Sequence, residues 1–83
     1  MIRMTGVKAL DGHRLECTFE NGEVVIYDMS YVLAKSTPML DPLKDPEFFT
    51  RVFIEAGAPL WPNGYDLCPD AIWQRTRASA EVS

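Results

Sequence analysis

The residues best suited to bind another molecule lie close together near the end of the chain, between Trp61 and Asp66. Trp61 and Tyr65 offer large ring surfaces, and Asn63 and Asp66 offer directed polar groups. The same residues also suit a structural loop. The Asn-Gly pair at its centre favours a turn, Trp61 can fill a small core, and Asp66 can accept amide hydrogens. The sequence leaves both roles open and favours the structural one, because turn chemistry alone accounts for these residue types.

Residues with the chemistry of catalysis are present, but their arrangement does not indicate an active site. Cys68 would need His13 as its base, and His13 falls in a predicted turn far from it in the sequence. Asp28, Asp66 and Asp70 could act as paired carboxylates only if the fold brought them within reach of one another. Neither cysteine has a Cys or His neighbour at metal-ligand spacing. We therefore expect no catalytic residue, no metal site and no cofactor.

Size and charge narrow the class of protein further. The chain has 83 residues, of which 47% are hydrophobic and 24% charged, as expected for one small globular domain. Twelve acidic residues against eight basic ones give a net charge of −4, which argues against direct nucleic-acid binding and suits a basic partner. No apolar run reaches the roughly 20 residues of a membrane span. Residues 1–4 lack the apolar stretch of a signal peptide, so we expect a cytoplasmic protein.

The first half of the chain predicts an antiparallel β-meander. Residues 2–10 and 24–29 are rich in strand-forming residues, and residues 14–20 alternate strictly between polar and apolar. A three-residue loop at 11–13 would pair Ala9 with Leu15, which keeps the apolar residues of both strands on one face.

The second turn of the meander is expected at Asn21-Gly22, because this pair tolerates the two positive φ angles of a two-residue hairpin loop. Such a loop pairs Phe19 with Val24 and Cys17 with Ile26. Val25 and Tyr27 would then point away from the core and form a candidate interaction surface. The residues assigned to the core face are Leu15, Cys17, Phe19, Val24 and Ile26.

The second half predicts short elements. Ser30 could cap a helical turn at 31–34, and Asp45 could cap a short helix over 46–51. Residues 52–54 and 58–61 predict a hairpin that turns at Ala56-Gly57. Together with the meander, this hairpin predicts an α+β fold with a sheet of four or five strands.

A helix is expected to begin at Pro69, which suits a first helical turn, and to run to about Arg75. The remaining residues, 76–83, are small or polar and predict a flexible C-terminal tail. The sequence therefore predicts a single α+β domain over residues 1–75.

Several segments, in fixed order, resemble the domain of unknown function 2442 family. They are Val7–Leu10, Leu15–Glu23, Asp28–Ser30, Leu43–Phe49 and Trp61–Asp70. The last is the most specific, because it is similar to the family's signature of Trp-Pro-Asn-Gly followed by Asp-Leu and Pro-Asp. The resemblance covers residues 2–73.

This resemblance implies a small bacterial α+β domain with a meander and no established catalytic activity. It also implies a gene placed beside that of a small partner protein, in an arrangement like that of a toxin–antitoxin pair. Some members of the family carry a fused helix-turn-helix DNA-binding domain.

We therefore expect a non-enzymatic, cytoplasmic protein-interaction or regulatory module, such as the antitoxin-like member of a two-gene pair. It would bind a protein partner or form a homo-oligomer. The alternative is a small-ligand-binding or enzymatic domain that uses the loop from Trp61 to Asp66. The candidate binding residues are Trp61, Asn63, Tyr65, Asp66, Val25 and Tyr27.

Overall fold

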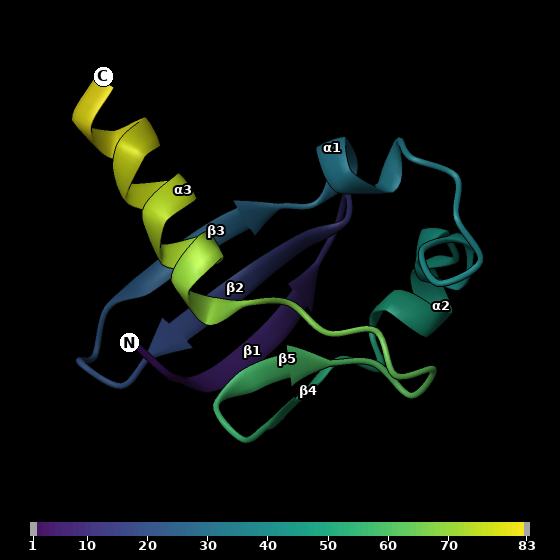
Figure 1. The fold of residues 1–83 in the computed structure, drawn as a ribbon, viewed down its shortest axis with the longest axis horizontal. Coiled ribbons are helices and arrows are strands. Elements are labelled where there is room, and N and C mark those ends of the chain that lie inside the picture. The colour runs from purple at the N-terminus through teal and green to yellow at the C-terminus, as the bar shows by residue number, and fades with distance from the viewer. Residues whose placement is uncertain (1, 83) are drawn as a thin grey trace.

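An antiparallel meander and a separate hairpin carry the strands of this protein (Figure 1). The computed structural model describes the backbone of residues 2–82 and the side chains of residues 2–76. It confirms the α+β class, with short helices between the two sheets and a helix at the C-terminal end. The elements are β1 (Met4–Leu10), β2 (Arg14–Phe19), β3 (Val24–Asp28), α1 (Ser30–Leu33), the 3-10 helix η1 (Asp41–Lys44), α2 (Pro46–Phe49), β4 (Phe53–Glu55), β5 (Ala58–Leu60) and α3 (Pro69–Val82).

The core lies on the face of the meander that α3 crosses (Figure 1), and buried residues of α1, η1, α2 and the loop after β5 complete it. The ring of Trp73 on α3 meets the ring of Phe19 on β2 edge to face, with centroids 5.0 Å apart. Near the other end of the sheet, Arg75 donates a 2.7 Å hydrogen bond to the hydroxyl of Tyr27. The largest fully buried side chains are Trp61, Phe19, Leu15, Met29, Leu43, Ile72, Pro59 and Cys17.

The first turn of the meander has the predicted three-residue loop. Ala9 lies opposite Leu15, and Val7 lies opposite Cys17. Gly12 and His13 both have positive φ, at 74° and 58°. The loop thus keeps the apolar residues of β1 and β2 on one face, and the predicted register is confirmed.

The second turn differs from the prediction by one residue. Phe19 donates its N–H to the carbonyl of Glu23, and Gly22 donates its N–H to the carbonyl of Phe19, both at 2.9 Å. Only Gly22 in this loop has a positive φ, of 88°. The side chain of Asn21 accepts the N–H of Glu23 at 3.0 Å instead of adopting the left-handed conformation. The loop therefore has three residues with a left-handed glycine at its end, a common alternative to the two-residue hairpin.

This shift reverses the two faces of β3, because side chains alternate along a strand. Val25 pairs with Cys17, and Tyr27 pairs with Leu15. Tyr27 is therefore buried and Val25 half-buried, whereas Val24 and Ile26 are 55% and 47% exposed. The prediction that Val25 and Tyr27 point away from the core, with Val24 and Ile26 in it, is wrong.

The helices between the sheets begin close to the predicted positions. Asp45 caps α2 by accepting the N–H of Glu47 at 3.1 Å, as predicted. The cap of α1 differs. Ser30 is the first residue of that helix, and its N–H is accepted by the side chain of Asp28 at 2.9 Å. Asp28 thus takes the acceptor role expected of Ser30.

The hairpin β4–β5 forms a second sheet. Ala56 and Gly57 both have positive φ, at 53° and 79°, so the two-residue turn expected at Asn21-Gly22 occurs here instead. One backbone hydrogen bond, from Met4 N–H to the carbonyl of Gly57 at 2.8 Å, ties the turn to β1. The prediction of a single sheet of four or five strands is therefore wrong. The short β5 also carries Pro59, which has no N–H for a ladder.

The C-terminal helix α3 begins at Pro69, as predicted, and continues past Arg75 to Val82. The division of the chain into a domain over 1–75 and a flexible tail over 76–83 stays a prediction.

Candidate functional site

The loop from Trp61 to Asp66 is held by its own backbone. The N–H of Trp61 donates to the carbonyl of Tyr65, and the N–H of Gly64 donates to the carbonyl of Trp61, both at 2.9 Å. Gly64 has a φ of 91°, which a glycine adopts without strain. Asp66 then forms an isolated antiparallel bridge with Leu60. The loop is a tight turn at the end of β5.

The side chain of Trp61 is directed into the core. It is 1% exposed, and its indole N–H donates to the carbonyl of Phe49 at 3.0 Å. Its ring lies 5.7 Å from the ring of Phe49 and 5.9 Å from that of Tyr65. Trp61 thus fills the core, the role that the sequence favours for it. Burial leaves the indole no surface on which a ligand could stack in this conformation.

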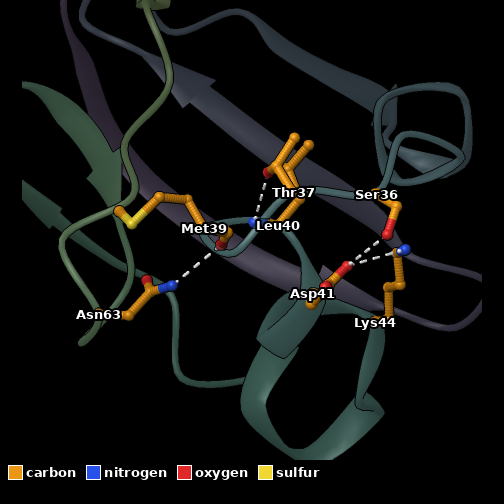
Figure 2. A network of polar contacts seen from close by, with 7 residues as sticks. All are labelled: Ser36, Thr37, Met39, Leu40, Asp41, Lys44 and Asn63. Atoms are coloured by element: carbon orange, nitrogen blue, oxygen red, sulfur yellow. Dashed lines mark hydrogen bonds and ion pairs between the residues drawn. The ribbon is translucent and has the colours of Figure 1, made fainter.

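Asn63 links the loop to the segment before η1 (Figure 2). Its amide nitrogen donates to the carbonyl of Met39 at 3.0 Å, and its amide oxygen accepts the N–H of Tyr65 at 3.2 Å. We expected Asp66 to accept an amide hydrogen in this loop. Among the described residues, the carboxylate of Asp66 accepts no hydrogen bond, and Asn63 takes that role because its side chain reaches the amide two residues on.

The segment that Asn63 holds has its own small polar network (Figure 2). The hydroxyl of Thr37 accepts the N–H of Leu40 at 3.1 Å. The carboxylate of Asp41 accepts a hydrogen bond from the ammonium of Lys44 at 3.1 Å and lies 3.5 Å from the hydroxyl of Ser36. These contacts link residues of the proline-rich connection to one another. This connection carries the Met39 carbonyl to which Asn63 donates.

Tyr65 and Asp66 meet Tyr27 in a surface groove of about 290 Å³ between α1 and α3. Burial raises the pKa of Tyr65, and the neighbouring Tyr27 and Asp66 raise it further. Its phenol therefore stays protonated at neutral pH and can donate a hydrogen bond. Tyr31, Lys35 and Arg75 also line the groove.

His13 and Cys68 line different hollows. The ring of His13 contacts the carbonyl of Lys44 at 3.0 Å and the ring of Phe49 edge to face. Exposed Cys68 lines the groove beside Asp66 and a second hollow beside Asp70. The carboxylate of Asp70 accepts the N–H of Ile2 at 2.9 Å. Over the residues that the structure describes, no group of three or more His, Cys, Asp or Glu side chains could hold a metal ion.

The open edge of the meander is β3, which carries the two residues that the sequence wrongly placed in the core. β3 pairs with β2 on one side, and no described strand pairs with its other side. Val24 and Ile26 on this strand are the exposed apolar residues of the outer face. The alternation of side chains along β3 could have indicated that Val24 and Ile26 are exposed, but only with the correct length of the loop that precedes the strand.

No helix among residues 2–82 is long and apolar enough to cross a membrane.

This fold and its signature loop define a family. The chain belongs to the family described as Protein of unknown function (DUF2442), whose model matches residues 4–78. It is also similar to the crystal structure of a Nitrosomonas europaea protein named "Putative DNA Binding Protein", with a TM-score of 0.81 and 34% identity. The match covers 98% of this chain and 52% of that one, so the chain spans about half the length of its relative. No curated protein matches the chain.

Proposed function

We propose that this chain is a non-enzymatic, cytoplasmic domain that binds a partner protein, as the antitoxin-like or regulatory member of a two-protein pair. The observation that carries the proposal is the open edge of β3, where Val24 and Ile26 are exposed beside unpaired backbone. An exposed sheet edge with apolar side chains is a site where another chain can bind. The loop from Trp61 to Asp66 supports the proposal indirectly, because its indole and its asparagine are used in packing.

The charge of the chain indicates the kind of partner. Its net charge is −4, so the long-range field favours association with a basic protein. Charge complementarity of this kind increases the association rate and excludes acidic competitors.

The name of the Nitrosomonas europaea protein raises DNA binding as a competing role. The present chain matches 52% of that protein, and its acidic balance opposes contact with phosphates. We therefore propose that this domain does not bind DNA directly and that its contribution to a DNA-binding protein would be regulatory.

A second candidate function is the binding of a small ligand in the groove between α1 and α3. Tyr27, Tyr65 and Asp66 converge there beside Lys35 and Arg75. Aromatic rings together with charged groups of both signs suit a small polar molecule with a planar body. The groove is an open surface feature and not an enclosed cavity, so we rank it below the protein-binding role.

The protein-binding role is tested with the product of the neighbouring gene. The two purified proteins are mixed and analysed by size-exclusion chromatography with light scattering. We expect one stable complex that contains both chains, and separate elution would contradict the pairing.

The same purified chain is used to test DNA binding and ligand binding. A gel shift with duplex DNA at low salt is expected to be negative, and a shifted band would favour DNA binding. Thermal shifts across a metabolite set test the groove, because a ligand at 100 times its dissociation constant adds about 2.7 kcal/mol to stability. The variant that tests the groove is Tyr31→Ala, which should abolish the thermal shift, since Tyr31 lines the groove and, at 78% exposed, can be truncated without disturbing the core.

A further inference from the structure

Two turns of the chain contain an asparagine followed by a glycine, and both are built in the same way. The asparagines are Asn21 and Asn63. Each following glycine donates its N–H at 2.9 Å to the carbonyl three residues before it, and each has a positive φ, of 88° at Gly22 and 91° at Gly64. Each asparagine accepts the N–H two residues on with its amide oxygen, at 3.0 and 3.2 Å. The two pairs therefore share their backbone hydrogen bonds and differ only in what else holds the side chain.

An Asn-Gly pair is the sequence in which a protein chain loses ammonia most readily. The glycine nitrogen gives up its proton to hydroxide and attacks the carbonyl carbon of the asparagine side chain. The bond from that carbon to the side-chain nitrogen breaks, and the nitrogen takes a proton from water and leaves as ammonia. The product is a cyclic succinimide. Glycine favours the attack because it has no Cβ to obstruct it.

Water then opens the succinimide at one of its two carbonyl carbons. One opening gives aspartate in an ordinary chain. The other gives isoaspartate, in which the backbone continues through the former side-chain carbon. In either case one amide and one water have become one carboxylate and one ammonium ion.

The side chain of Asn63 is held at both of its polar atoms. Its nitrogen donates to the carbonyl of Met39 at 3.0 Å, as Figure 2 shows, and its oxygen accepts the N–H of Tyr65. The turn is also fixed by Trp61, which is 1% exposed. Both side-chain hydrogen bonds must break before the carbonyl carbon of Asn63 can turn toward the nitrogen of Gly64.

The side chain of Asn21 is held at one atom only. Its oxygen accepts the N–H of Glu23, and its nitrogen donates no hydrogen bond among the residues that the structure describes. Asn21 is exposed, whereas Asn63 is half-buried. The bond from the glycine N–H to the carbonyl before it must open in both turns, so it does not distinguish them. The fold therefore protects Asn63 by one more hydrogen bond and leaves Asn21 the more reactive of the two.

The two products would affect the hairpin differently. Aspartate at residue 21 keeps the length of the backbone and an oxygen that can accept the N–H of Glu23. Isoaspartate lengthens the backbone of the loop by one carbon atom. This loop sets the register between β2 and β3, through the hydrogen bonds that join Phe19 to Gly22 and to Glu23.

We propose that Asn21 is a site of chemical modification in the folded protein, where loss of ammonia gives isoaspartate and aspartate, and that Asn63 is protected from the same reaction by its bond to the Met39 carbonyl. The isoaspartate form weakens the hairpin of β2 and β3. This inference concerns the chain alone and does not depend on the proposed protein-binding function.

The two sites can be followed separately in one sample. The folded chain is incubated at mildly alkaline pH, and portions are digested with trypsin at slightly acidic pH, which limits further reaction. Trypsin places Asn21 in the peptide 15–35 and Asn63 in the peptide 52–75. Mass spectrometry measures the fraction of each peptide in which an acid has replaced the amide.

We expect Asn21 to react at least about fivefold faster than Asn63, the ratio that one additional hydrogen bond accounts for. Equal rates, faster reaction at Asn63, or no reaction at Asn21 would overturn the proposal. The control is the same chain unfolded in urea, in which the two Asn-Gly pairs should react at similar rates. Slow reaction of Asn63 in urea as well would show that its local sequence protects it, and the role of the Met39 carbonyl would be wrong.

The effect on the hairpin is measured on the modified chains, which anion exchange separates because they carry one more negative charge. Their matched control is Asn21→Asp, which has the same charge and the same mass but no isoaspartate. We expect the modified fraction to melt about 4 °C or more below this variant. Equal melting temperatures would contradict the weakening of the hairpin.

Discussion

The indole N–H of Trp61 donates a 3.0 Å hydrogen bond to the carbonyl oxygen of Phe49, which joins the residue after β5 to the last residue of α2. The two rings also pack with centroids 5.7 Å apart. One side chain therefore closes the loop of the family signature onto the helical connection, and it does so from a fully buried position.

Removing this contact should destabilise the domain strongly. Trp61→Ala is expected to lower the free energy of unfolding by about 3–5 kcal/mol, because it leaves a large cavity in a small core. Trp61→Phe keeps most of the packing and leaves the Phe49 carbonyl without its donor, at a cost of about 1–3 kcal/mol. The urea midpoints of the two variants measure these losses, provided that the m-value stays the same. An unchanged midpoint for Trp61→Ala would mean that the indole does not stabilise the fold and would favour a binding role.

The amide of Asn63 should matter to stability more than the carboxylate of Asp66. Asn63→Ala removes the bonds to Met39 and Tyr65 and should cost about 1–3 kcal/mol for two hydrogen bonds. Asn63→Asp keeps the acceptor and loses the donor, so an intermediate cost is expected. Asp66→Ala, at an exposed residue, should stay within about 0.5 kcal/mol of the wild type. Chemical denaturation of the three variants tests this order, and a larger loss for Asp66→Ala than for Asn63→Ala would contradict it.

Two glycines with similar backbone angles should respond differently to alanine. Gly57 and Gly64 have φ values of 79° and 91°, so alanine is strained at both, by about 1–2 kcal/mol. A Cβ at Gly57 would also lie 2.9 Å from the Cβ of Arg3, whereas nothing lies within 4 Å at Gly64. Gly57→Ala should therefore be the more destabilising by about 1 kcal/mol or more, the usual scale of overpacking. Thermal melts of the pair test the difference, and equal melting temperatures would mean that Arg3 moves aside without cost.

The two meander loops show how far local sequence determines register. At residues 11–13 the apolar pattern of both strands selected the three-residue loop, because a two-residue loop would place Lys8 opposite Leu15. At Asn21-Gly22 the apolar pattern did not distinguish a two-residue loop from a three-residue loop. Val24, Val25 and Ile26 are all apolar, so either register buries apolar residues. The side chain of Asn21 then decides, because it accepts the N–H of Glu23 and stabilises the longer loop.

The candidate site, too, could be predicted from the sequence only in part. The sequence identified the signature loop, and the core role of Trp61 followed from its size alone. It did not distinguish Asn63 from Asp66 as the loop acceptor, because both side chains can bond to nearby amides and only the path of the chain places Met39 within reach of Asn63. The open edge at β3 depended on the register and on the separation of the two sheets, and both are tertiary properties.

The buried thiol of Cys17 makes stability fall at alkaline pH. Burial raises its pKa from 9.0 to about 12, and the charge of Glu16 adds to this. Above pH 9 the unfolded chain loses the thiol proton while the folded chain keeps it, so the unfolded state binds fewer protons and stability decreases as pH rises. This contribution is complete below pH 9.0 and is lost as the pH approaches about 12. Because the pKa of Cys17 is raised in the folded state, this thiol cannot make stability rise with pH.

The measurement uses a Cys68→Ser background, because Cys68 is exposed and its thiol would react first. Urea midpoints at about pH 8 and about pH 10.5 are compared with those of the same protein carrying Cys17→Ala. We expect the midpoint to fall more steeply with pH when Cys17 is present, since tyrosine and lysine titrations are common to both proteins. A thiol reagent should label Cys17 only after urea unfolds the chain. Equal pH slopes, or rapid labelling of the folded protein, would contradict the burial of this thiol in the core.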